Sequence, residues 1–142
     1  MIEVKNVTKS FDSVTAVQDV SFTTEPGEIF GLIGPNGAGK STTIRMIMNI
    51  LAPDSGSIFF EGKPIAEKDK DRIGYLPEER GLYKKVKVND MLLYLGELKG
   101  RERDRLQKNI DYWLDRFDLS DWKMKPISEL SKGMSQKVQF IA

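Results

Sequence analysis

The chain has 142 residues, with 22 Lys and Arg against 21 Asp and Glu, so its net charge is +1. This balance argues against a strongly basic nucleic-acid-binding arm. The chain contains neither cysteine nor histidine, which excludes disulfides, thiolate catalysis, a histidine general base and the commonest zinc ligands. Magnesium-assisted phosphoryl transfer remains open, because it uses backbone amides, lysine, hydroxyls and carboxylates.

The first part of the chain has an α/β pattern. Ile29-Phe30-Gly31-Leu32-Ile33 is a continuous apolar run, which predicts a strand buried on both faces. From Ser41 to Leu51 the apolar residues follow a helical spacing, and the turn residues 53–56 are expected to end that helix. The predicted strands lie at residues 2–7, 14–22, 29–33, 57–61 and 72–76.

The part after Pro77 has a helical pattern. Apolar residues from Val88 onward predict one helix with Gly100 as its C-cap, and the apolar stripe at 106–117 predicts a second. Ser131 is a suitable N-cap for a third helix. We therefore expect an α/β domain over residues 1–77, a linker over 78–87 and a helical domain over 88–142.

A glycine-rich loop joins the apolar strand to the first helix. Its sequence fits the phosphate-binding pattern G-x-x-x-x-G-K-[ST]: Gly34-Pro35-Asn36-Gly37-Ala38-Gly39-Lys40-Ser41, followed by Thr42. Glycine lets the backbone approach and wrap a triphosphate, and the start of the helix attracts anions. We expect Lys40 to reach the β- and γ-phosphates, Ser41 to hold magnesium and Thr42 to bind the α-phosphate. A chance loop between a strand and a helix is the alternative.

Two further segments resemble markers of the ATP-binding-cassette (ABC) ATPases. Leu130-Ser131-Lys132-Gly133-Met134 resembles their LSGGQ signature, and Ile73-Gly74-Tyr75-Leu76-Pro77-Glu78 resembles the strand that leads into their Q-loop. Together with the phosphate-binding loop, these markers stand in the order that the family has. The resemblance implies a P-loop NTPase core with an N-terminal β subdomain, an incomplete parallel sheet and an α-helical subdomain. The segment after Pro77 is similar to the NatA-type exporter branch.

The resemblance also implies roles for single residues. Phe11 matches the aromatic residue that stacks on adenine, and Val17 matches the apolar contact beside the sugar; a core role is the alternative for Phe11. Ser131 and Gly133 match residues that contact ATP bound to the opposite subunit of a head-to-tail dimer. Glu78 stands where the family usually has glutamine, and a carboxylate there is also able to ligate magnesium.

By this resemblance the chain is the N-terminal part of an ATP-hydrolysing subunit of roughly 220–300 residues. The Walker B strand, the catalytic glutamate and the switch histidine would follow Ala142, so no catalytic residue is assigned here and the 142 residues alone are expected to be inactive. The implied cofactors are ATP and Mg²⁺. The implied partners are a transmembrane permease and a second cassette, without nucleic acid.

The expected location is cytoplasmic, peripheral on the inner face of the cell membrane. The Met1–Val4 start lacks the basic and apolar pattern of a signal peptide, and no apolar run approaches the roughly 20 residues of a spanning helix. Two alternatives remain at this point: a small-molecule P-loop kinase, and a soluble ABC protein that acts on nucleic acid.

Overall fold

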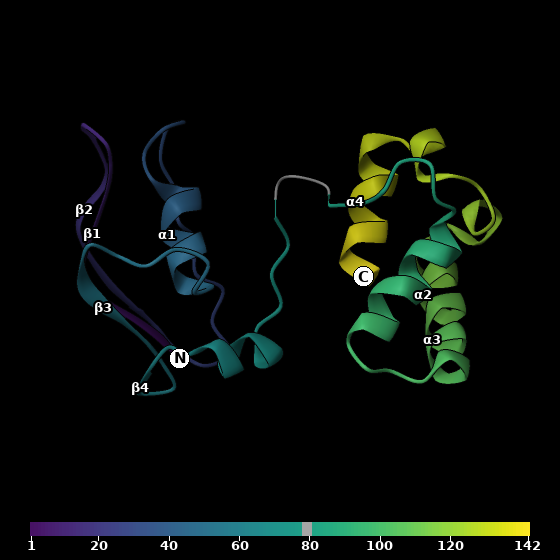
Figure 1. The fold of residues 1–142 in the computed structure, drawn as a ribbon, viewed down its shortest axis with the longest axis horizontal. Coiled ribbons are helices and arrows are strands. Elements are labelled where there is room, and N and C mark those ends of the chain that lie inside the picture. Colours follow the sequence, from purple (N-terminus) through teal and green to yellow (C-terminus); the bar gives the residue numbers. More distant parts are fainter. Residues whose placement is uncertain (78–80) are drawn as a thin grey trace. The chain divides into compact units, whose positions relative to one another are not determined.

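The structure is a computed structural model that describes residues 1–77 and 81–142. The chain divides into two compact units, Met1–Tyr75 and Leu76–Ala142, called here the first and second unit (Figure 1). Each unit has its own buried apolar cluster.

The first unit is built on an antiparallel sheet. Its strands are β1 (Ile2–Phe11), β2 (Val14–Thr24), β3 (Ser55–Phe60) and β4 (Lys63–Pro64), in the order β2-β1-β3-β4. β1 pairs with both neighbours, so Ile2 lies opposite Thr24 on one side and Phe60 on the other. Val4 and Val7 of β1 are fully buried, which agrees with the apolar positions that predicted this strand.

The helix α1 (Lys40–Ile47) covers the apolar face of this sheet (Figure 1). Its Met46 is buried in one cluster with Val4, Val7 and Ile58. The helix ends earlier than predicted, because Asn49 takes a left-handed conformation with φ 51° and breaks the helix before the proline turn is reached. A short 3₁₀ segment, η1 (Glu67–Arg72), follows the sheet.

Two predicted strands are wrong in this structure. Residues 29–33 and 72–76 have no strand pairing among the described residues, and every described strand pair is antiparallel. Ile29 is fully exposed and Ile33 is 94% exposed, whereas the prediction placed them in a buried strand. An apolar run becomes a strand only when another strand supplies hydrogen-bond partners, and the described segments supply none. The predicted parallel part of the sheet is therefore not formed here.

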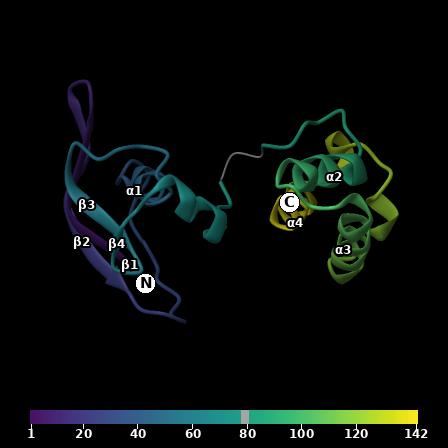
Figure 2. The same ribbon diagram turned by 60° about the horizontal axis from the view of Figure 1, so that its bottom comes forward.

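The second unit is helical, as predicted. Its α-helices are α2 (Val88–Leu98), α3 (Arg103–Arg116) and α4 (Lys132–Ile141), joined in part by the 3₁₀ turns η2 (Ser120–Trp122) and η3 (Ile127–Glu129). Figure 2 shows these helices gathered into one body. Gly100 follows the end of α2 with φ 70°, the left-handed conformation expected of a residue that ends a helix.

The core of the second unit forms because one face of each helix is apolar. Its members are buried and come from all three helices and the turns between them, and the most enclosed are Val88, Met91, Leu114, Leu119 and Val138. The polar side chain of Asn89 is also buried, and it accepts a hydrogen bond from Gln107 Nε2 at 2.9 Å. Among the described residues, no helix is both long and apolar enough to cross a bilayer.

Candidate nucleotide-binding site

The glycine-rich loop lies in the first unit and leads directly into α1. Residues 34–38 are exposed, and the loop bends through a turn in which Ala38 N–H donates to Pro35 O at 3.2 Å. Gly39 is the N-cap of α1, and no described side chain caps this helix start. The first N–H groups of α1 therefore have no acceptor within the helix. The positive end of the helix dipole faces the loop.

Lys40 folds back over the loop that precedes it. Its ammonium group donates to Gly34 O and to Pro35 O, both at 2.7 Å. These two carbonyls fix the cation beside the uncapped helix start. The loop thus gathers a positive charge and free N–H groups on one exposed surface, which is the donor set that a phosphate chain requires.

Both the backbone conformation at position 39 and the lack of space for a Cβ atom require a glycine there. Its φ is +83°, in the left-handed region, and a Cβ there would overlap the carbonyl oxygen of Ala16 and lie 2.9 Å from Val17 Cγ2. Gly37 has nearly the same φ of +84°, but a Cβ there would meet nothing within 4 Å. The loop is therefore fixed against β2 at Gly39 and open to solvent at Gly37.

The hydroxyl residues after Lys40 differ in position. Ser41 is exposed and Thr42 is half-buried, whereas Thr43 is buried and its Oγ1 donates to Gly39 O at 3.0 Å. The exposed position of Ser41 suits a residue that binds a metal between protein and phosphate, whereas Thr43 fastens the first turn of the helix. Sequence reasoning missed the role of Thr43, although a hydroxyl four residues after Gly39 is a recognisable signal for this bond.

The two residues expected near the base and sugar lie on the β1–β2 hairpin. Phe11 ends β1, pairs with Val14 across the turn, and is 44% exposed. Its ring has Lys9 Nζ 5.7 Å from its centroid. Val17 is buried in the core of the first unit against Gly39, so only a minor part of it is open to a ligand.

The residues expected to act on a second subunit lie in the second unit. Ser131 caps α4, because its Oγ accepts the Met134 N–H at 3.2 Å and its carbonyl accepts from the Ser135 backbone. Gly133 is exposed, and a Cβ there would meet nothing within 4 Å. The start of α4 is therefore accessible, with Lys132 also exposed beside it.

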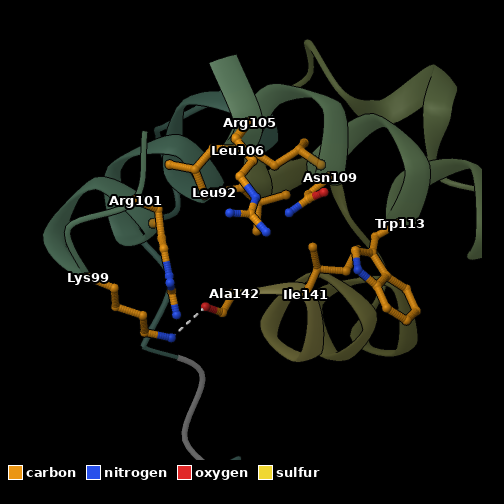
Figure 3. A pocket seen from close by; sticks show the side chains of 11 residues that line it. Leu92, Lys99, Arg101, Arg105, Leu106, Asn109, Trp113, Ile141 and Ala142 are labelled. Carbon is orange, nitrogen blue, oxygen red and sulfur yellow. Dashed lines mark hydrogen bonds between the residues drawn. The ribbon is translucent and has the colours of Figure 1, made fainter. Parts of the chain in front are cut away.

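Glu78, the second expected magnesium ligand, lies outside the described residues. A pocket of about 370 Å³ in the second unit is lined by none of the predicted site residues that the structure describes (Figure 3). Lys99, Arg101 and Arg105 bring positive charge to it, and Lys99 Nζ donates to Ala142 O at 2.9 Å. The candidate phosphate site is thus an exposed loop of the first unit and not a preformed cavity of the second.

Comparison with known proteins identifies the family of the chain. The sequence profile described as ABC transporter matches residues 17–142. YhaQ, an ABC transporter ATP-binding protein of Bacillus subtilis, is 46% identical over 142 residues, covering all of this chain and 48% of that protein. NatA, an ABC transporter ATP-binding protein of the same organism, is 40% identical over 129 residues, covering 88% of this chain and 52% of that protein.

Comparison of the structure with solved structures identifies the same family. A solved structure of an ATP-binding subunit of an ABC transporter superposes with a TM-score of 0.82 at 31% identity, covering 99% of this chain and 60% of that one. The chain therefore belongs to the ABC transporter family, as an ATP-binding component, and it has the predicted class of fold apart from the parallel strands. It spans about half the length of the relatives named here.

Members of this family generally bind and hydrolyse ATP, typically with Mg²⁺, and work with transmembrane permease components. The Lys40 ammonium group and the free N–H groups at the start of α1 are hydrogen-bond donors of the kind that the phosphates of ATP require. The family assignment confirms the predicted class of function and leaves the small-molecule kinase without support.

Proposed function

We propose that the whole protein is the ATPase subunit of an ABC exporter, and that residues 34–42 bind the phosphates of Mg–ATP. The observation that carries this proposal is the uncapped start of α1 with Lys40 Nζ held 2.7 Å from Gly34 O and Pro35 O. When a phosphate chain enters, the ammonium group exchanges these carbonyls for phosphate oxygens, and the free N–H groups donate to the same anion.

The magnesium ion supplies charge neutralisation on the phosphates when it is bound. Ser41 holds it through its exposed hydroxyl, and Glu78 is the second proposed ligand. Phe11 stacks on the adenine ring, and Val17, which lies next to Gly39 of the loop, makes the apolar contact beside the sugar. In this proposal, residues 1–77 hold the nucleotide, 78–87 link to the helical domain, and 88–142 carry the signature segment.

Ser131 and Gly133 contact the nucleotide of a second cassette. The exposed start of α4 and the open space above Gly133 support this role, because a phosphate is able to approach the helix there. The permease is the membrane partner, which places the subunit peripherally on the cytoplasmic face of the membrane. The resemblance of the segment after Pro77 to the NatA-type exporter branch favours export over import.

Turnover by these 142 residues alone is expected to be low. Hydrolysis requires a group that orients the attacking water in addition to a magnesium shell. The chain has no histidine, and Glu78 would have to serve both magnesium and water. Phosphate release by this chain should therefore equal that of its Lys40→Ala variant, and a rate well above that blank would refute this part of the proposal.

Nucleotide binding is tested by titrating the protein with Mg–ATP. Lys40→Ala removes a charge-assisted hydrogen bond of about 1.5–3 kcal/mol, so the Kd should rise roughly 10-fold to 150-fold. Lys68→Ala is the matched control, since Lys68 is an exposed lysine of the same unit outside the loop. Equal affinities of the wild type and Lys40→Ala would contradict the proposed site.

A further inference from the structure

The tip of the β1–β2 hairpin extends past the rest of the sheet (Figure 2). The pairing of β1 with β3 ends at Thr8 opposite Ser55, whereas its pairing with β2 continues to Phe11 opposite Val14. The last residues of β1 therefore have a strand neighbour on one side only. An isolated two-stranded hairpin is marginally stable in water, so this tip needs another support.

Asp54 supplies that support from the residue just before β3. Its backbone N–H donates to Thr8 O at 2.9 Å, its Oδ1 accepts from Lys9 Nζ at 2.6 Å, and its Oδ2 accepts from Ser10 N–H at 2.7 Å. One residue thus binds three consecutive residues of β1, and the next residue along the strand is Phe11. The hydrogen bond from Lys9, followed by that from Ser10, lowers the pKa of the Asp54 carboxyl, as expected of a carboxylate stabilised by these donors.

The hairpin would be poorly defined without this contact. The β1–β2 register shifts between Lys9 and Ser10, so the pairing with β2 is irregular just before Phe11. Lys9 Nζ already lies 5.7 Å from the centroid of the Phe11 ring, within the range of a cation–π contact. Asp54 holds the Lys9 ammonium group in this position, so loss of Asp54 would release both the end of β1 and the cation next to the ring.

We propose that Asp54 is a positioning residue for nucleotide recognition: it fixes the end of β1 and holds Lys9 beside the Phe11 ring, so that the ring keeps the position in which it stacks on the adenine base. This inference rests on the proposed function, because it needs Phe11 to stack on the base. Asp54 acts through Phe11 and touches no phosphate, so its effect is confined to ligands that carry a base.

The test measures the Kd of Mg–ATP and of Mg–pyrophosphate for variants of the protein. Phe11→Ala should weaken ATP roughly 5-fold to 150-fold, which corresponds to the 1–3 kcal/mol of a stacked base, and leave pyrophosphate unchanged. Asp54→Ala should weaken ATP by part of that factor, roughly threefold or more, again without an effect on pyrophosphate. In the Phe11→Ala background, Asp54→Ala should have no further effect on ATP, because the ring through which it acts is absent.

Glu61→Ala is the matched control. It removes a carboxylate that accepts two hydrogen bonds from Arg72 next to the other end of β3, so it alters the same sheet without touching the hairpin tip. The ratio of ATP to pyrophosphate affinity should stay at the wild-type value. Asp54→Asn provides a milder variant, since its amide oxygen still accepts from Ser10 N–H while the charge that restrains Lys9 is lost, and its effect should be smaller than that of Asp54→Ala.

Several results would overturn the inference. Equal weakening of ATP and pyrophosphate by the Asp54 variants would show a general structural role. A persisting effect of Asp54→Ala in the Phe11→Ala background would show that it does not act through the ring. If Phe11→Ala itself weakens both ligands equally, base stacking fails and this inference fails with it, whereas the Lys40→Ala result still tests the phosphate site separately.

Discussion

Gly39→Ala should disrupt the candidate site by displacing the backbone of the loop, although it removes no group that binds a ligand. The substitution places a methyl group where φ is +83° and where the carbonyl oxygen of Ala16 already occupies the space. The obstructing atom belongs to the backbone of β2, so no side-chain rotation relieves the overlap. The loop must shift away from β2, and the start of α1 must shift with it.

Two costs contribute to the loss of folding stability caused by Gly39→Ala. A non-glycine residue in the left-handed conformation costs about 1–2 kcal/mol, and overpacking a well-filled contact costs about 1–3 kcal/mol. Gly39→Ala should therefore lower the free energy of unfolding of the first unit by about 2–5 kcal/mol. It should also weaken Mg–ATP, because the displaced loop no longer presents the Lys40 ammonium and the helix N–H groups together.

The variant Gly37→Ala distinguishes the cost of the left-handed conformation from the cost of overpacking. Gly37 has almost the same φ, +84°, but its added Cβ would meet nothing within 4 Å. Its loss in stability should be the conformational part alone, about 1–2 kcal/mol. Both variants are compared with the wild type by urea denaturation. If Gly39→Ala and Gly37→Ala are equally stable, the contact with Ala16 does not hold the loop and the reasoning is refuted.

The remaining predictions concern packing, capping and pH. Leu114→Ala should destabilise the second unit by about 2–5 kcal/mol in urea denaturation, because Leu114 is only 1% exposed, whereas Leu98→Ala, at a position 66% exposed, should change little. Ser131→Ala should lower the stability of the same unit by about 1 kcal/mol through the lost N-cap, and Ser131→Asn should restore most of it. Hydrogen bonds from Arg72 lower the pKa of the Glu61 carboxyl, so its stabilisation is present above the ordinary pKa and is lost as the pH falls through the lowered one. The stability difference between the wild type and Glu61→Gln should therefore be seen at pH 7 and disappear well below about pH 4; a constant difference would contradict it.

The sequence was most informative where structure depends on neighbours along the chain. Helix spacing predicted α2, α3 and α4, and the hydroxyl of Ser131 predicted the start of α4, because these features arise within a few residues. The apolar run at residues 29–33 failed as a strand for the opposite reason. Strand formation depends on a partner elsewhere in the chain, and no described segment pairs with it.

The same distinction holds within the candidate site. The loop composition identified Lys40 and the glycines, since the motif is contiguous. It did not identify Asp54, which reaches Ser10 across 44 residues of sequence, nor the contact of Gly39 with Ala16 on β2. Both depend on which strands lie side by side, and a spacing pattern does not contain that information.

These two long-range contacts connect the ends of the proposed nucleotide site. The β1–β2 hairpin touches the phosphate-binding loop where Ala16 and Val17 face Gly39, and the same hairpin presents Phe11 at its tip. One hairpin therefore carries Phe11, which is proposed to bind the base, and also contacts the loop that is proposed to bind the phosphates. Asp54 ties the tip of this hairpin to the start of β3, and Gly39 fixes the loop against its side. Because Gly39 fixes the loop against the side of the hairpin and Asp54 holds only its tip, Gly39→Ala should impair phosphate recognition, whereas loss of Asp54 or of Phe11 should weaken only ligands that carry a base.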